Sequence, residues 1–301
     1  MPVNYAEQYQ QAVQQAYFGG LYFRALYETP NNQNVKWTNA KTVQIPRITV
    51  GGFIDVDRDV ASNFARRADN DWETKTLVHD REFPMFVDPQ DVDETNTVLS
   101  IANITRVFNT EQKIPEMDKY LASKLFSEFE NYGGQAETTV LTVDNVLTVF
   151  DQMMEDMDEA EVPQEGRILY VTSPVKTLLK NAEKIQRSLD IKGTSANDAN
   201  RNLRSLDDVT IVSVPTSRMK TAYNFTSGAV PATGAGQINM ILIHPSAVIT
   251  PQKYDFVDLA APSATTGGKY YYFERKYWDV FLFEKKVPGV KFHITEVGAG
   301  E

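Results

Sequence analysis

The spacing of apolar residues changes several times along the chain, and its longest extended stretch lies in the first third. Apolar and polar residues alternate in the first run of this stretch, which predicts a strand. The apolar members are Val43, Ile45, Ile48 and Val50. Pro46 in their midst suits an edge strand. A second run, residues 72–87, also alternates, so residues 42–88 predict a long two-stranded arm.

The arm has a charged tip and little that could fill a core. Its tip carries acidic and basic residues side by side, namely Asp55, Asp57, Asp59, Asp69, Asp71, Arg58, Arg66 and Arg67. Such a mixture suits a complementary protein surface better than a nucleic acid. Because an isolated two-stranded ribbon is marginal in water, we expect the arm to lie against a surface outside itself.

Helical spacing of apolar residues is found on both sides of the arm. Before it, residues 4–20 predict a short amphipathic helix. After it, residues 98–108 carry a broad apolar stripe, and Pro115 either begins a second helix or kinks the first. Residues 115–132 give the strongest helical pattern, which a glycine ends. A further helix is predicted over residues 142–157.

Apolar strands separate the helices in the second half of the chain. The run at 168–171 is followed at once by a Ser-Pro pair that predicts the start of a helix. Two more apolar strands are predicted at 209–214 and 238–243, so the middle of the chain is a mixed α/β unit. Residues 269–294 are dense in aromatic and β-branched side chains and predict long strands.

Composition narrows the classes of function. The chain has 301 residues, 42% of them hydrophobic, enough for a substantial core. A net charge of −10 does not favour non-specific attraction to nucleic acid. Without cysteine, the chain can build no disulfide framework, zinc ribbon or thiol nucleophile. Its start resembles no signal peptide, and no stretch approaches the roughly 18 apolar residues of a membrane span, so we expect a cytosolic protein.

Histidines and glycine loops give little support to catalysis. His79, His244 and His293 are scattered and have no second ligand at metal-binding spacing, so we interpret them as structural or surface residues. The Gly-Ala-Gly segment at 234–236 lacks the third glycine of a dinucleotide loop and precedes a strand. The sequence has neither a phosphate loop nor a Gly-x-Ser-x-Gly elbow. No catalytic residue, cofactor or metal is therefore predicted.

Two groups of carboxylates are the remaining candidates for a site. Asp88, Asp91, Asp93 and Glu94 form one tight cluster, which could hold calcium or act as an acid/base pair. The cluster lacks the spacing of an EF-hand loop, and the dipole of the following helix already accounts for carboxylates there. The acidic run at 155–161 is more typical of a solvated face than of a site.

Four segments resemble the major capsid proteins of tailed bacteriophages, in the same order and across essentially the whole chain. Residues 86–95 (FVDPQDVDET) resemble the stretch that leaves the extended loop of that family. Residues 114–120 (IPEMDKY) resemble its long spine helix. Residues 167–179 and 241–247 resemble its axial domain, and residues 277–290 resemble the last strands of its peripheral domain.

The resemblance implies an α+β fold with the architecture of these capsid proteins. Residues 1–41 would form an N-terminal arm, and residues 42–90 an extended β-hairpin loop. Residues 91–135 and 265–297 would form a peripheral domain with a long spine helix and a β-sheet. Residues 136–264 would form an α/β axial domain.

The resemblance also implies a structural protein and not an enzyme. Copies would self-assemble through hexamers and pentamers into an icosahedral capsid that encloses double-stranded DNA without sequence-specific binding. The other expected partners are a scaffolding protein and a portal protein, with no membrane; the protein would be made in the cytoplasm of a bacterial host and reside in the virion. In this family the extended loop lies over the neighbouring subunit. The residues expected in such contacts are Ile48, Val50, Phe53, Arg58, Arg66, Arg67, Trp72 and Lys75.

Two alternatives stay open at this point. An encapsulin-like compartment would share the fold but hold cargo enzymes in place of a genome. A cytosolic α/β enzyme would use the carboxylates between Asp88 and Glu94.

Overall fold

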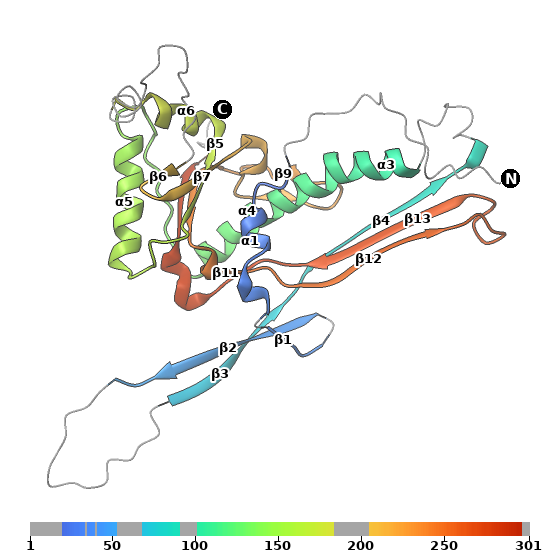
Figure 1. Cartoon of the computed structure of the whole chain (residues 1–301), viewed down its shortest axis with the longest axis horizontal. Helices are drawn as coiled ribbons and strands as arrows, with labels where there is room; N and C mark the ends of the chain where they lie inside the picture. Colours follow the sequence, from blue (N-terminus) through green and yellow to red (C-terminus); the bar gives the residue numbers. More distant parts are fainter. Residues whose placement is uncertain are drawn as a thin grey trace, which may run out of the picture.

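The computed structural model describes residues 20–33, 35–39, 41–52, 68–90, 101–183 and 205–296. Four predictions lie wholly or partly outside these residues: the amino-terminal helix, the tip of the arm, the first carboxylate cluster and the start of the apolar stripe at 98–108. The residues concerned at the tip and in the cluster are Phe53, Asp55, Asp57, Arg58, Asp59, Arg66, Arg67, Asp91, Asp93 and Glu94. Figure 1 shows a body from which the arm projects to one side, while a three-stranded sheet and a long helix extend in another direction.

The arm is a three-stranded antiparallel sheet in the order β1-β2-β3, formed by β1 (Lys36–Trp37), β2 (Thr42–Val50) and β3 (Ala68–Thr76). The predicted strand over Val43 to Val50 is confirmed. β1 pairs only with Val43 and Gln44, so one side of β2 is already free at Pro46, where a residue without an N–H is tolerated.

The second predicted run is two strands and not one. β3 ends at Thr76, and β4 (His79–Val87) pairs with β13 in another sheet. The prediction of a two-stranded arm over residues 42–88 is therefore wrong beyond Thr76. The reason is the junction: Leu77 is buried, and the N–H of Val78 donates to the buried carboxylate of Asp279 at 2.8 Å, which turns the chain into the body.

A long helical segment forms the spine of the body. It consists of α3 (Ile101–Phe108), a π-helical turn at Asn109–Lys113, and α4 (Ile114–Asn131). Pro115 lies in the first turn of α4, where its missing N–H cannot continue the preceding helix. α4 is followed by Gly133 with φ +78°, as the predicted stop requires. The predicted apolar face is buried: Tyr120, Leu121, Leu125 and Phe129.

The mixed α/β unit contains a five-stranded sheet in the order β15-β10-β5-β7-β6. Its strands are β5 (Ile168–Thr172), β6 (Ser205–Leu206), β7 (Val209–Val214), β10 (Gln237–Ile243) and β15 (Val290–Thr295). β5 and β7 are parallel, and α6 (Ser173–Asn181) follows β5 directly. α5 (Val146–Glu159) buries Val146, Phe150, Met153 and Met157 against this sheet. The strands predicted at 168–171, 209–214 and 238–243 are thus confirmed.

The third sheet has the order β12-β13-β4, with β12 (Gln252–Ala260) and β13 (Tyr270–Trp278) forming a long hairpin beside the spine (Figure 1). One face of this sheet packs on the helical segment, where Phe83 stacks on Phe108 with ring centroids 3.7 Å apart. The aromatic end of the chain forms β13, as predicted. However, β15 does not join the sheet of β13 but pairs with β10, so the last predicted strands belong to two different sheets.

Short elements complete the described fold. They are α1 (Arg24–Tyr27), η1 (Pro30–Gln33), η3 (Thr216–Arg218), β8 (Tyr223–Asn224), β9 (Val230–Pro231), η4 (Pro245–Ala247), β11 (Val248–Ile249), β14 (Phe281–Leu282) and η5 (Glu284–Gly289). Among the residues that the structure describes, no helix is long and apolar enough to cross a membrane.

Candidate functional site

The two faces of the arm differ in composition and in burial. Strand register places Pro46 opposite Trp72, and Ile48 and Val50 opposite Asn70 and Ala68, so these residues share one face. On this face the exposed fractions are 65% for Ile48, 68% for Val50 and 41% for Trp72. We call Ile48, Val50 and Trp72 the arm strip. A projecting strip of large apolar side chains marks a surface for contact with another molecule.

The base of the arm, by contrast, is covered by its own chain. Val43 and Ile45 lie on the face opposite the arm strip and are buried with Leu77, Tyr277 and Phe281. The expectation that the whole arm lacks support from its own molecule is therefore wrong for the base and holds for the arm strip. The reason is the alternation of side chains along β2, which gives the body one face and leaves the other uncovered.

Lys75 is fixed at the base and not displayed at the tip. Its ammonium group bonds the hydroxyl of Tyr132 and lies 2.9 Å from a carboxylate oxygen of Glu73 and 3.8 Å from one of Glu128. Burial opposes the charge of Lys75, but the bonds to Tyr132 and Glu73 outweigh burial and raise its pKa. The structure thus gives Lys75 partners in its own chain, and a contact with another copy stays a prediction for this residue.

A second set of contacts sets the direction of the arm further out. Arg47 donates to a carboxylate oxygen of Glu284 at 2.7 Å, and the ammonium group of Lys285 donates to the carbonyl oxygen of Ile48 at 2.9 Å. Both partners come from η5. A groove of about 290 Å³ lies between η5 and the arm, with Ile249 and Phe283 in its lining.

Two buried carboxylates, which the sequence analysis did not single out, anchor the chain on either side of the arm. Asp118 of α4 accepts from the N–H groups of Tyr22 and Phe23 at 3.1 and 3.2 Å and from Arg218 at 2.7 Å. It thereby fixes Tyr22 and Phe23 against α4. Asp279 holds the start of β4, as described above. Their only sequence signal was a carboxylate inside an apolar pattern.

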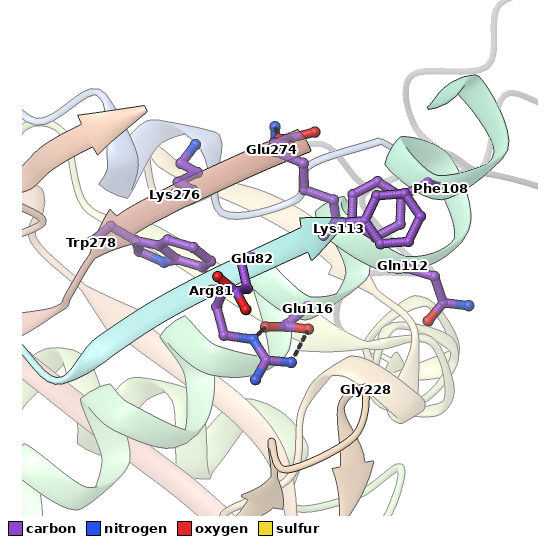
Figure 2. A pocket seen from close by; sticks show the side chains of 11 residues that line it. Arg81, Glu82, Phe108, Gln112, Lys113, Glu116, Gly228, Glu274, Lys276 and Trp278 are labelled. Carbon is purple, nitrogen blue, oxygen red and sulfur yellow. Dashed lines mark hydrogen bonds and ion pairs between the residues drawn. The ribbon is translucent and has the colours of Figure 1, made fainter. Parts of the chain in front are cut away.

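A cavity of about 260 Å³ lies between the spine and the inner face of the third sheet. Figure 2 shows the side chains that line it. Phe83 and Phe108 line it together with charged side chains, four of which form two ion pairs. Arg81 donates to Glu116 at 2.6 Å, and Lys113 bonds Glu274. Within the described ranges, no group of three or more His, Cys, Asp or Glu side chains could hold a metal ion. The cavity offers paired ions and aromatic walls, which stabilise the contact between helix and sheet.

The three histidines lie in different parts of the fold. His79 on β4 stacks on Tyr120 with ring centroids 3.7 Å apart and lies 3.3 Å from Glu116. His244 follows β10 and contacts the hydroxyl of Ser246 at 2.7 Å. His293 on β15 is buried, and its Nε2 lies 2.7 Å from the carbonyl oxygen of Thr139. The interpretation of these residues as structural agrees with these contacts.

His293 gives the fold a predicted dependence on pH. Burial lowers its pKa below the usual value, although the carbonyl of Thr139 partly opposes burial. The unfolded chain therefore binds more protons just below pH 6.5, and stability falls as the pH drops through the window between the unfolded and folded pKa values. We expect wild-type unfolding free energy to fall by up to about 1.4 kcal/mol per pH unit there, measured by urea denaturation at pH 7.5, 6 and 5.

The variant His293→Asn should show a flatter pH dependence. His244→Asn is the comparison variant: burial also lowers the pKa of His244, but its side chain is more exposed than that of His293, so this variant should flatten the pH dependence less. A slope unchanged in His293→Asn would contradict the assignment.

The carboxylate candidates are partly engaged within the chain. Asp88 accepts from the N–H of Gln90 at 3.0 Å, and the other members of its cluster lie outside the described residues. In the acidic run at the end of α5, Asp156 bonds Lys291 at 3.0 Å and Asp158 bonds the buried Arg167 at 2.6 Å. These two acids therefore tie α5 to the sheet.

No protein-family model matches the sequence, and no curated protein matches it either. Several solved structures resemble the chain over nearly its whole length. The mature capsid of bacteriophage PhiM1 is 15% identical with a TM-score of 0.65, over 98% of this chain and 92% of that one. The capsid of cyanophage P-SCSP1u is 11% identical with a TM-score of 0.65, over 96% and 92%. The capsid of Myoviridae phage XM1 is 11% identical with a TM-score of 0.60, over 98% of both chains.

The chain therefore has the fold of phage capsid proteins. This confirms the α+β fold that the order of the four resembling segments implied. The likeness covers the arm, the spine and both further sheets, because nearly the whole chain is included.

Proposed function

We propose that this chain is the major capsid protein of a tailed bacteriophage, whose copies assemble into an icosahedral shell around double-stranded DNA. The observation that carries the proposal is the structural likeness to phage capsids over 96–98% of the chain. The uncovered arm strip supports it, because a projecting apolar face needs a partner surface.

The proposed shell forms by repeated contacts between unlike surfaces of identical chains. Such heterologous contacts close into rings when the rotation between copies allows it. Hexamers and pentamers are the rings that we propose, and the virion capsid is the proposed location. Many modest contacts add up, so the shell can resist the pressure of packed DNA although each arm contact is small.

Three partners belong to the proposal beyond the copies themselves. A scaffolding protein would guide assembly, and a portal protein would occupy one vertex. The enclosed DNA would touch the wall without sequence-specific recognition. The net charge of −10 repels the phosphate backbone, so the DNA could move along the wall without binding tightly to it. The nucleic acid content of purified particles separates this proposal from an encapsulin-like compartment, which would hold protein cargo.

The test of the proposed function is the loss of particles without loss of folding. The wild-type chain should form closed particles in negative-stain electron microscopy. The variant Ile48→Ser/Val50→Ser/Trp72→Ser should remain soluble and folded but lose particles by more than about a hundredfold, since each side chain stabilises a covered contact by about 1.5–3 kcal/mol. Deleting residues 48–76 is a poorer test, because it removes the strand that pairs with the buried base.

The control changes the opposite face of the arm. Thr49→Ser/Asp69→Asn/Asp71→Asn alters three residues that pair across β2 and β3 on that face. Particles should form normally from this control. Wild-type chains that stay monomeric, with or without a scaffolding protein, would contradict the proposed function, as would catalytic activity that Asp91→Ala/Asp93→Ala abolishes without changing the size of the molecule.

A further inference from the structure

β12 is an edge strand with an uncovered outer side. It pairs with β13 on one side, and no strand among the described residues pairs with the other. Eight of its nine residues are exposed. The large apolar side chains lie on both faces, with exposed fractions of 43% for Tyr254, 40% for Phe256, 55% for Val257 and 41% for Leu259. An edge of this kind presents a row of unpaired N–H and C=O groups to any strand that fits.

Aromatic rings continue from this edge across the face of the sheet that points away from the spine. Tyr254 and Phe256 of β12 stack with centroids 5.9 Å apart, and Phe256 lies 6.3 Å from Phe273 of β13. The ring centroid of Phe273 lies 6.2 Å from that of Tyr271. The ring centroid of Tyr271 lies 4.7 Å from that of Phe86 of β4. The row crosses all three strands and ends at the free edge with Phe256 and Tyr254.

The usual protections of an edge strand are weak here. Proteins blunt edges with bulges, prolines or charges. In β12 the pairing irregularity lies at its start, between Gln252 and Tyr254, so residues 254–260 form a regular edge. Asp255 lies 3.8 Å from the ammonium group of Lys276, and the carboxylate of Asp258 accepts from the N–H of Leu259 at 2.9 Å, so both acids of this edge have partners in their own chain. Residues 254–260 thus form a regular, uncovered edge with large apolar side chains on both faces, and such an edge invites pairing with another strand.

We propose that β12 pairs antiparallel with β12 of a second copy, with Phe256 on the two-fold axis, so that two three-stranded sheets join into one of six strands. The choice of a second copy as the partner rests on the proposed function, in which many copies meet. It also rests on the strand itself. β12 has exposed apolar side chains on both faces of the sheet, and a second β12 would place apolar side chains beside them on both faces. This isologous contact lies apart from the arm strip.

Charge and side-chain size select the register. A two-fold axis through Asp255 or through Asp258 would place two like charges directly opposite each other, which is destabilising. An axis through Val257 would place the ring of Phe256 opposite the carboxylate of Asp258, and an axis through Tyr254 would fall on the pairing irregularity between Gln252 and Tyr254. An axis through Phe256 places two aromatic rings together and Tyr254 opposite Asp258, whose carboxylate can accept from the tyrosine hydroxyl. Asp255 then lies opposite Val257, with Lys276 still beside it.

The absence of cysteine from the sequence makes the test direct. In the proposed register the two copies of residue 256 have Cα atoms about 4.5–5.5 Å apart, within the range of a disulfide. Phe256→Cys should therefore give a disulfide-linked dimer under mild oxidation, at least about tenfold faster than Asp258→Cys, whose two copies lie roughly 14 Å apart along the strands. Val257→Cys, one position away, should also cross-link slowly.

A mixture of two variants keeps Phe256 intact. Tyr254→Cys and Asp258→Cys should each cross-link slowly alone but join rapidly with each other, because they are opposite in the register. Rapid linkage of Phe256→Cys and of this mixture supports the proposal. Equal rates for all single variants, or rapid linkage of Val257→Cys, overturns it.

The result is independent of shell formation. Cross-linking is measured both in particles and in the soluble fraction, after denaturing electrophoresis without reductant. Particles that form but contain no residue-256 dimer would overturn the pairing and leave the proposed function intact. Dimers that link through residue 256 without any particle would support the pairing and count against the proposed shell.

Discussion

Replacing Asp118 with alanine is expected to lower the free energy of unfolding by about 3–5 kcal/mol, because it leaves the buried guanidinium of Arg218 without its partner. The carboxylate of Asp118 is fully buried, and burial raises its pKa against the opposing effect of Arg218. Asp118→Ala also removes the acceptor for the N–H groups of Tyr22 and Phe23. Urea denaturation of the unassembled chain, followed by tryptophan fluorescence, measures the loss.

A double-mutant cycle identifies the cause. Asp118→Ala/Arg218→Met removes both charges and should recover a large part of the loss, since no uncompensated charge is left in the interior. If the double variant were as unstable as the sum of the two single variants, the unpaired charge could not be the reason. Lys124→Met serves as a control on the same helix, because its ion pair with Glu128 is partly exposed and should contribute less than about 1 kcal/mol.

Asp279→Ala is expected to cost about 3 kcal/mol, since hydrogen bonds to a charged group each contribute about 1.5–3 kcal/mol. The carboxylate accepts from the N–H of Val78 at 2.8 Å and from the hydroxyl of Tyr120 at 2.7 Å. Burial and the nearby carboxylate raise the pKa of Tyr120, so its hydroxyl keeps the proton that it donates. The same denaturation measurement applies.

The loss at Asp279 should also reach the arm. Without the bond to Val78, the turn between β3 and β4 keeps only the buried side chain of Leu77 and the backbone bonds of Leu77 to Lys41 and Tyr277. Hydrogen exchange in β3 should therefore speed up along with the global loss of stability. Tyr120→Phe removes one donor to Asp279 and keeps the bond to Val78, so it should lower the free energy of unfolding by only about 1 kcal/mol. The hydrogen-exchange rate of β3 relative to that of the body should then stay unchanged. Equal effects of Asp279→Ala and Tyr120→Phe on β3 would contradict the role of Asp279 at the turn.

Local pattern was sufficient for most of the elements. Apolar residues that recur every three to four positions predicted the spine over residues 115–132 and α5. Apolar residues in alternation or in short runs predicted the strands β2, β5, β7 and β10, because side-chain spacing decides which face can be buried. β12 was missed although Asp255 lies between Tyr254 and Phe256, since eight of its nine residues are exposed and the strand carries no buried face to signal it. The anchoring roles of Asp118 and Asp279 were not predictable, because their partners lie 95 to 201 residues away in the sequence.

The sequence by itself determined that the chain has an extended arm, a long spine helix, an α/β unit and an aromatic end, since each follows from residues that are neighbours along the chain. The arm strip needed the register of β2 and β3, which brings Trp72 to the face of Ile48 and Val50. Only the tertiary structure decided which sheet each strand joins. β4 leaves the arm at Leu77 and β15 leaves β13 for β10, while β12 keeps an open edge. Strand pairing is non-local: any alternating run can pair with several others, and burial of the junction residues and of charges such as Asp279 selects among them.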